Sequence, residues 1–95
     1  MLFVVTAFDR PGAGSLRTRH RPAHLDYLEG KASQIRAGGA LLDPDDQPIG
    51  SMLIIEAANQ AAAEALVADD PFRREGVFER VEVRPWRAVL GTWVA

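Results

Sequence analysis

The chain has 95 residues, 47% of them hydrophobic and 25% charged, which is typical of one globular domain spanning residues 1–95. Its net charge of −2 lacks the basic surplus with which nucleic-acid-binding proteins displace counterions, so we expect no nucleic-acid partner. Cysteine is absent, which excludes disulfides, thiolate nucleophiles and cysteine-ligated metal centres.

The opening stretch Leu2 to Asp9 (LFVVTAFD) is rich in β-branched and aromatic residues and predicts a strand. Both of its faces are mostly apolar, so we expect a central strand that is covered on both sides. A loop containing Pro11, Gly12, Gly14 and Ser15 follows it.

From about Thr18 the hydrophobic period changes to that of an amphipathic helix. The apolar stripe consists of Leu25, Leu28, Ala32 and Ile35. Pro22 suits the first turn of such a helix, where a missing N–H costs little. The pair Gly38-Gly39 predicts the end of the helix, because glycine readily forms a left-handed cap.

The second half of the chain predicts two strands, a helix and a last strand. These are a strand over Ala40 to Asp43, a strand over Ile49 to Ala58, a helix over Gln60 to Ala68 and a strand over Val77 to Trp86. Asn59 is a good N-cap for that helix. Pro71 ends it, because proline disfavours helical geometry at the preceding residue.

This βαββαβ order predicts an α+β fold of the ferredoxin-like type, an antiparallel sheet with two helices on one face. The strands are apolar on both sides, and the tail over about 87–95 continues the apolar character. Its large apolar residues, with the one just before it, are Trp86, Leu90, Trp93 and Val94. An apolar face of this size predicts a homodimer with sheets face to face. The alternative is one larger core that the tail closes as a lid.

The first strand is too short and alternating for a signal peptide and lacks a basic leader. No apolar run approaches the roughly 18 residues of a membrane helix. Together with the lack of cysteine, this predicts a cytoplasmic protein with no membrane association.

The segments Arg21-Pro22-Ala23-His24-Leu25 and Asp70-Pro71-Phe72 resemble the YciI-like (YCII-related) family. The resemblance also covers Gly38-Gly39, Gly50-Ser51 and Val83-Arg84-Pro85-Trp86, and so nearly the whole chain. It implies a dimeric ferredoxin-like α/β barrel with a His–Asp pair and no bound cofactor. One catalytic example in that family is a dehydrochlorinase of a chlorinated hydroxyhydroquinone.

His24 immediately precedes the apolar Leu25, so we expect its side chain to border the core rather than point into bulk water. An imidazole that exchanges protons near neutral pH can contribute roughly 10²- to 10⁴-fold as a general acid or base. Alternatively, His24 is a structural residue that donates to a backbone carbonyl.

Asp70 is the candidate partner that fixes the histidine tautomer and stabilises the imidazolium. Alternatively it is a turn residue before proline. In a βαββαβ sheet it reaches His24 only by lying alongside the middle of the first helix, or from the partner subunit. The sequence leaves these two arrangements open.

Three further residues are candidates for substrate binding. Arg21 would attract an anion or phenolate, Ser51 would offer a hydroxyl from within an apolar strand, and Tyr27 would line the pocket. The alternatives are a solvated cation, a hydroxyl bonded to a neighbouring backbone group, and ordinary packing.

His20 and His24 have the i, i+4 spacing of two metal ligands on one helix. A zinc site usually needs three ligands, and neither a third ligand nor the glutamate of HExxH is evident, so no metal is predicted. Motifs for nucleotide binding or serine hydrolysis are also absent from the sequence.

These features predict an enzyme that uses His24 and Asp70 for elimination or tautomerisation of a small polar substrate, such as a hydroxylated ring, without a cofactor. Two alternatives remain. One is a dimeric module that binds a small ligand, or acts as an accessory, without converting it. The other is a structural protein whose purpose is its dimer surface.

Overall fold

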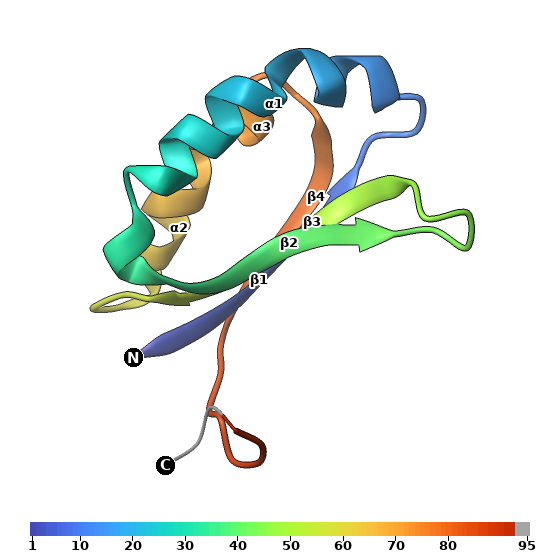
Figure 1. Cartoon of the computed structure of the whole chain (residues 1–95). Coiled ribbons are helices and arrows are strands. Elements are labelled where there is room, and N and C mark those ends of the chain that lie inside the picture. Colours follow the sequence, from blue (N-terminus) through green and yellow to red (C-terminus); the bar gives the residue numbers. More distant parts are fainter. Residues whose placement is uncertain (93–95) are drawn as a thin grey trace.

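The computed structural model describes residues 1–92 and has an α+β fold with one four-stranded antiparallel sheet (Figure 1). The sheet order is β2-β3-β1-β4. The strands are β1 (Leu2–Asp9), β2 (Ile35–Leu42), β3 (Pro48–Glu56) and β4 (Phe78–Pro85). The helices are α1 (Gly14–Glu29), the 3-10 turn η1 (Ala32–Gln34), α2 (Gln60–Ala68) and α3 (Pro71–Arg74). All the α-helices lie over one face of the sheet, which confirms the ferredoxin-like arrangement.

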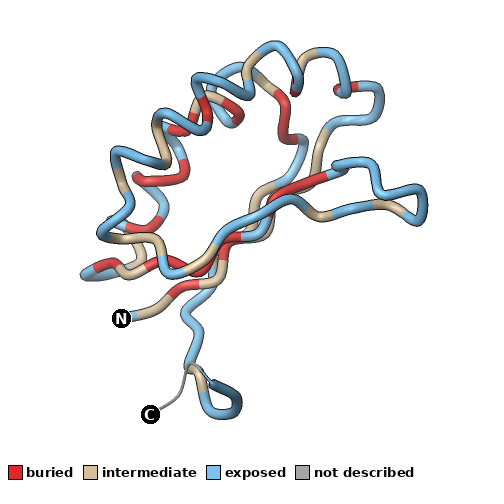
Figure 2. The backbone as a smooth tube through the Cα atoms, in the orientation of Figure 1, coloured by how far each residue is buried: buried red, intermediate tan, exposed pale blue. Residues whose placement is uncertain are grey.

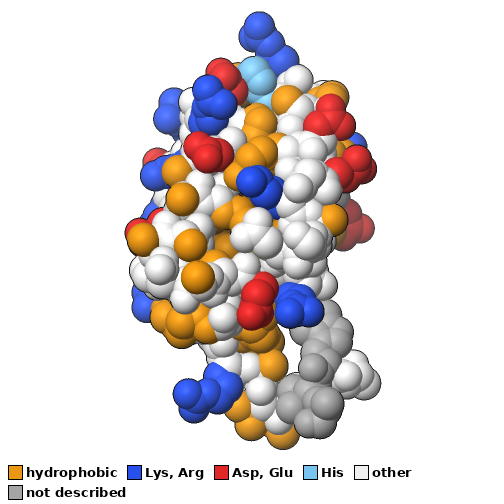
Figure 3. Space-filling view, turned by 90° about the vertical axis from the view of Figure 1, so that its left-hand side faces the viewer, with side chains coloured by type: hydrophobic (Ala, Val, Ile, Leu, Met, Phe, Trp, Pro, Cys, Tyr) orange, Lys and Arg blue, Asp and Glu red, His pale blue; other side chains and the backbone are white. Residues whose placement is uncertain are grey.

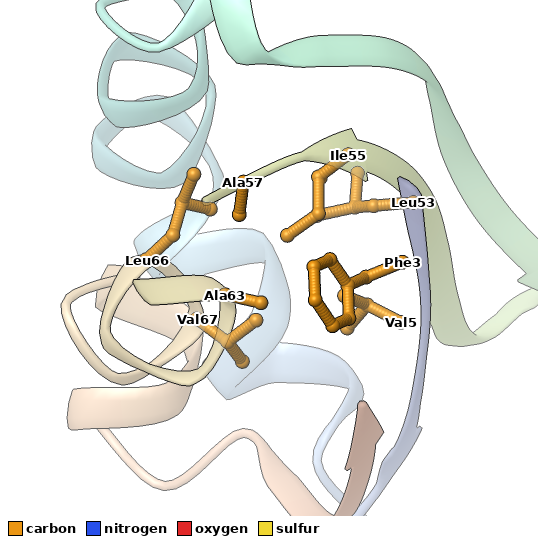
Figure 4. Packing of buried hydrophobic residues seen from close by; sticks show 8 residues of the cluster. All are labelled: Phe3, Val5, Leu53, Ile55, Ala57, Ala63, Leu66 and Val67. Atoms are coloured by element: carbon orange, nitrogen blue, oxygen red, sulfur yellow. The ribbon is translucent and has the colours of Figure 1, made fainter. Parts of the chain in front are cut away.

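The main core lies between the sheet and α2. Phe3 and Val5 of β1 face Leu53 and Ile55 of β3, and all four are at least 93% buried (Figure 4). The remaining members of the cluster come from the segment around α2, and they are Ala57, Ala63, Leu66 and Val67. Burial of this apolar surface, at about 25 cal/mol per Å², is the main force that holds α2 on the sheet.

Strand β1 has the predicted bounds and the predicted central place, between β3 and β4. Its odd-numbered residues Phe3, Val5 and Ala7 are buried beneath the helices, and its even-numbered residues are half-buried on the other face (Figure 2). The period-2 alternation of a strand accounts for this difference between the two faces.

The first helix differs from its predicted bounds. It begins at Gly14 rather than near Thr18, and it ends with Gly30 as its C-cap. Pro22 therefore lies inside the helix and not in its first turn, so the carbonyl of Thr18 lacks the usual N–H partner. Both residues are exposed on this helix, where water can satisfy that carbonyl.

The pair Gly38-Gly39 does not cap a helix, as predicted, but lies in the middle of β2. Ile35 likewise belongs to β2 and not to the helical stripe. A Cβ atom at Gly38 would collide with the side chain of Leu53 on the neighbouring strand β3. The glycine thus leaves room for the side chain of Leu53 between two strands and does not end a helix.

In the second half, α2 has the predicted bounds, and the side chain of Asn59 caps it by accepting from the N–H of Ala62 at 2.8 Å. The short helix α3 was not predicted. It begins directly after Asp70, whose side chain caps it, with Pro71 in its first turn. The Asp70-Pro71 segment, which was predicted only to end α2, therefore also begins α3.

The sheet face away from the helices is only partly covered by the described residues. Met52 is 40% exposed there, and the even-numbered residues of β1 are half-buried. Beyond β4 the chain runs away from the sheet, with Val89 67% and Leu90 90% exposed. The described part of the tail therefore does not form a lid, and Trp93 and Val94 lie outside the described residues. Figure 3 shows a different side, the left-hand side of Figure 1, where hydrophobic side chains gather along the middle with charged side chains around them.

Candidate functional site

A cavity of about 600 Å³ lies between α1 and the β2–β3 half of the sheet. Its volume lies within the range of small-molecule sites, roughly 300 to 1,000 Å³. Of the residues that the sequence singled out, Arg21, His24 and Ser51 line this cavity. Arg21 and His24 come from α1, where Arg21 is exposed and His24 is buried, and Ser51 comes from the middle of β3.

His24 and Asp70 are in direct contact within one chain. The Nδ1 of His24 lies 2.7 Å from the Oδ1 of Asp70, although the residues are 46 positions apart. His24 lies well inside α1 and not in its first turns, and α3 packs against α1. Of the two arrangements left open by the sequence, the structure therefore has Asp70 alongside the middle of the helix.

The carboxylate of Asp70 is fixed by a second hydrogen bond. Its Oδ1 also accepts from the backbone N–H of Phe72 at 2.9 Å, as the N-cap of α3. Asp70 is 3% exposed and His24 is 7% exposed, so water competes little for either group. Because a carboxylate only accepts hydrogen bonds, Nδ1 of His24 is the donor in this pair.

The other ring nitrogen of His24 is open to the cavity. Nε2 makes no hydrogen bond to any residue within 1–92. No buried side-chain nitrogen or oxygen in that part of the chain lacks a partner, so Nε2 has access to solvent space. With Nδ1 holding the proton, Nε2 presents its lone pair to whatever occupies the cavity. This is the arrangement that a general base requires.

Phe72 holds the face of the imidazole. The two ring centroids are 3.8 Å apart and the ring planes differ by 7°. Phe72 is itself 1% exposed and meets the ring of Phe78 edge-on. The imidazole is thus held at its edge by Asp70 and at its face by Phe72.

Arg17 belongs to the site, although the sequence analysis did not single it out. It is 8% exposed and lines the cavity. Its Nη2 donates to the carbonyl of Gly50 at 2.9 Å and to Oγ of Ser51 at 3.1 Å. Its Nη1 contacts both carboxylate oxygens of Asp9, at 3.1 and 3.3 Å. The guanidinium also lies 4.8 Å from the centre of the Phe72 ring.

The signal for Arg17 is its spacing, because it precedes His24 by seven residues and so lies on the same face of α1. A predicted helix that begins near Thr18 leaves it out. Burial raises the pKa of its partner Asp9 above the usual value, although the charge and the hydrogen bond of Arg17 act to lower it. The buried ion pair is therefore costly to desolvate.

Tyr27 does not lie in the lining of the cavity. Its hydroxyl donates to the carbonyl of Leu66 at 2.7 Å and so ties α1 to α2. Burial, followed by the negative charges of Asp69 and Asp70, raises the pKa of Tyr27 above its usual value. These contacts give Tyr27 a structural explanation.

Arg21 is exposed at the cavity and forms no ion pair with any described residue.

Within residues 1–92 no group of three or more metal-ligating side chains lies together. His24, one of the two histidines with metal-ligand spacing, is already engaged by Asp70. In the same part of the chain, no helix has the length and apolar character needed to cross a membrane.

Comparison with known sequences gives one family. The sequence model of the YCII-related domain matches residues 1–87. Protein YciI of Escherichia coli O6:H1 is 32% identical over 98 residues, which cover 95% of this chain and all of that protein. Protein YciI of Shigella flexneri matches to the same extent.

Among solved structures, 5-chloro-2-hydroxyhydroquinone dehydrochlorinase from Burkholderia phenoliruptrix AC1100, in complex with 2,5-dihydroxybenzoquinone, is similar to this chain. The identity is 36%, the TM-score is 0.85, and the match covers 92% of this chain and 94% of that one. A crystal structure of an antibiotic biosynthesis monooxygenase matches with 21% identity and a TM-score of 0.57, covering 95% and 100% of the two chains. The second likeness concerns the fold alone.

Proposed function

Because this chain belongs to the YCII-related domain family, we propose that it is an enzyme that uses His24 as a general base and acid on a small molecule. The reaction is an elimination or a tautomerisation of a polar, enolisable substrate such as a hydroxylated ring. The observation that carries this proposal is the short contact between Nδ1 of His24 and Asp70, which leaves Nε2 open to the cavity.

The chemistry follows from this arrangement. Nε2 removes a proton from the substrate, and the resulting imidazolium is stabilised by the carboxylate of Asp70. The electron pair left on the substrate either expels a leaving group or is reprotonated at another atom. Neither route needs an oxidant, a reductant or a metal ion. Likeness to a dehydrochlorinase with a bound dihydroxybenzoquinone supports this class of substrate.

The function is tested with 5-chloro-2-hydroxyhydroquinone, the substrate named for the similar enzyme, by measuring chloride release. A second assay follows exchange of the ring hydrogens of 2,5-dihydroxybenzoquinone in D₂O by NMR, because it needs no leaving group. We expect the protein to accelerate at least one process and His24→Ala to slow it by roughly 10²- to 10⁴-fold. Circular dichroism of the variant serves as the control for folding.

Equal rates for His24→Ala and the unaltered protein would remove His24 from the mechanism. Binding of 2,5-dihydroxybenzoquinone without any acceleration would favour the alternative, a module that binds a small ligand without converting it. The two outcomes differ in whether the unaltered protein turns over at all.

We further propose that two copies pair through the sheet face away from the helices. Half-buried apolar residues of β1 and the 40% exposed Met52 support this pairing. Light scattering should then give twice the 10.4 kDa chain mass, and Met52→Arg should give the monomer. Ala61→Arg places the same charge on an exposed position of α2, and this control should remain a dimer.

A further inference from the structure

The cavity is larger than a single hydroxylated ring. Its volume of about 600 Å³ corresponds to about twenty water molecules at about 30 Å³ each. A dihydroxybenzoquinone has about half as many non-hydrogen atoms as that number of waters, and its covalently bonded atoms pack more closely. A ring placed against His24 therefore leaves a large part of the cavity unfilled.

The polarity of the cavity changes along helix α1. Because an α-helix rises about 1.5 Å per residue, the lining residues Arg17 and Leu28 lie about 16 Å apart along the helix axis. Every lining residue of α1 from Arg17 to His24 is polar, whereas Leu25 and Leu28 beyond it are apolar. The cavity thus has a polar end toward the start of α1 and an apolar end beyond His24.

The sheet side of the cavity has the same division. At the polar end Ser51 of β3 pairs with Ala40 of β2, and further along the two strands Leu53 pairs with Gly38. The missing side chain of Gly38 leaves the space that the Leu53 side chain occupies. Ile35 at the start of β2 continues this wall. The sheet therefore turns from polar to apolar in the same direction as the helix.

We call the apolar lining residues at this end of the cavity the apolar end, and they are Leu25, Leu28, Ala32, Ile35 and Leu53. Leu25 is 39% exposed, Ala32 is exposed, and Leu28 and Ile35 are only partly buried. The pairing of two copies proposed above uses the opposite face of the sheet and leaves the apolar end open. Exposed apolar surface that continues a polar site is typical of a ligand groove.

Glu29 limits the kind of group that suits the apolar end. Among the lining residues of α1 beyond His24, it alone carries a charge, and it is exposed. Its negative charge disfavours a carboxylate or phosphate at this end, and the apolar end itself offers no side-chain hydrogen bond. An uncharged apolar group is the chemistry that these residues match.

We propose that the apolar end binds an alkyl or aryl substituent of the substrate while the reacting ring lies against His24. This rests on the proposed function and narrows its substrate class to an enolisable or hydroxylated ring that carries an apolar side chain. The substituent takes no part in proton transfer. It contributes to binding by removing apolar surface from water, by about two- to fourfold in affinity for each methylene buried.

The test uses 2,5-dihydroxybenzoquinone and its 3-methyl, 3-propyl and 3-hexyl derivatives, with affinities measured by calorimetry. The unaltered protein is compared with Ala32→Asp, which places a carboxylate in the apolar end. Ser33→Asp is the matched control, because Ser33 is an exposed residue of the same 3-10 turn η1 outside the cavity lining. Leu25→Gln is a second variant that leaves the core intact, since Leu25 is 39% exposed. Thermal unfolding confirms that each variant is folded.

We expect the hexyl derivative to bind the unaltered protein at least tenfold more tightly than the methyl derivative. The heat-capacity change of binding should become more negative as the chain lengthens, which marks burial of apolar surface. Ala32→Asp should lose most of the gain with chain length, because the substituent would desolvate a carboxylate. Leu25→Gln should reduce the gain. Ser33→Asp should keep it, although it carries the same added charge as Ala32→Asp.

Failure of the whole series to bind, or equal affinities along it, would overturn the proposal. Equal gains with chain length in Ala32→Asp and Ser33→Asp would also overturn it, by placing the substituent elsewhere. A lower mass of Ala32→Asp than of the unaltered protein in light scattering would assign the apolar end to a contact between copies, against the proposal.

The proposed function fails by a different result, when the unaltered protein shows no turnover or His24→Ala retains it. The gain with chain length is measured at equilibrium and needs no turnover. His24→Ala is expected to keep this gain, because His24 lies outside the apolar end. The two proposals therefore have distinct readouts.

Discussion

Phe72 and His24 stack face to face, and the carboxylate that holds the imidazole belongs to a residue only two positions before Phe72. Asp70 accepts from Nδ1 of His24 and from the N–H of Phe72 with the same oxygen. The start of α3 therefore sets both the rotation and the plane of the imidazole. The imidazole therefore has few degrees of freedom left to order, which would favour the proton transfer that we propose.

Two substitutions distinguish the effect of the Phe72–His24 ring stack from the effect of the side-chain volume of Phe72. Phe72→Ala should lower the free energy of unfolding by about 3 to 5 kcal/mol, because it leaves a cavity in the core. Phe72→Leu keeps most of the volume and should cost only about 1 kcal/mol, while still removing the flat support of His24. Urea denaturation measures the free energy of unfolding of both variants, and turnover of Phe72→Leu measures the effect of losing the flat support of His24. Full activity in a stable Phe72→Leu protein would show that the stack has no part in catalysis.

Asp70 has two roles that an asparagine separates. Asn is as good an N-cap as Asp, so Asp70→Asn should leave the stability of α3 nearly unchanged. It removes the negative charge that stabilises the imidazolium, and we expect turnover to fall by roughly 10²-fold or more. Asp70→Ala should reduce both the free energy of unfolding and turnover, with about 1 kcal/mol of the stability lost from the cap alone. Stability and kinetics of the two variants, compared side by side, check this separation.

Tyr27 is the single tyrosine, so its phenolate absorbance can be titrated without interference. Burial, with the charges of Asp69 and Asp70, raises its pKa, and the absorbance midpoint should lie above the usual value of about 10. A raised pKa in the folded state means that the contribution of Tyr27 to stability is complete below about pH 10 and is lost as pH rises further.

Tyr27→Phe is the matched variant for that titration. It removes the hydrogen bond to the Leu66 carbonyl and should lower the free energy of unfolding by about 1 kcal/mol at pH 7. In this variant, the part of the fall in the free energy of unfolding above pH 10 that is due to this phenol should be absent. A midpoint at or below 10 in the unaltered protein would contradict the buried hydrogen bond.

Asp9 should titrate above the usual range of an aspartate, because the pKa-raising effect of burial exceeds the opposing effect of Arg17. Carboxyl carbon NMR measures this midpoint directly. Arg17→Gln removes both influences that lower the pKa, so the midpoint should move still higher. Because the folded-state pKa is raised, stability from this group is present below about pH 4 and lost as pH rises, more so in the variant. A lower midpoint in Arg17→Gln would refute the pairing.

Gly50 and Gly39 form a matched pair of strand glycines. A Cβ atom at Gly50 would collide with the carbonyl oxygen of Ala7 on the neighbouring strand, whereas one at Gly39 would meet nothing within 4 Å. Gly50→Ala should therefore lower the free energy of unfolding by about 1 to 3 kcal/mol. Gly39→Ala should stay within about 0.5 kcal/mol of the unaltered protein. Chemical denaturation compares them, and equal losses would point to a general effect of side chains in these strands.

The sequence was most informative where local periodicity and tertiary packing agree. Strand β1 and helix α2 have their predicted bounds, because their patterns are regular and Asn59 caps α2. The end of the first helix was misplaced because Gly38-Gly39 is locally typical of a helix end. In the fold these glycines instead lie in β2, where Gly38 packs against Leu53. Pro22 was likewise assigned to a first turn by its local preference, although an exposed helix interior tolerates it here.

For the site, the resemblance to the family pointed to His24 and Asp70, and only the fold could decide that they meet within one chain. Arg17 was missed because its significance lies in a contact across α1 and β3, which no local pattern contains. Tyr27 was selected for its distance from His24 along the helix, yet the turn of the helix directs its hydroxyl toward Leu66. Spacing alone cannot tell such a side chain from one that faces the cavity.

Strand β2 borders the cavity with Ile35 and with Gly38, Gly39 and Ala40, and at these last three positions the wall carries little or no side chain. The size of ligand that the cavity accepts is thus set in part by the small residues of β2, which are distant along the chain from His24 and Asp70. A larger residue at Ala40 would narrow the chamber and leave His24 and Asp70 in place. Under the proposed function, ligand selectivity and reactivity could for this reason diverge independently during evolution, since different segments of the protein encode them.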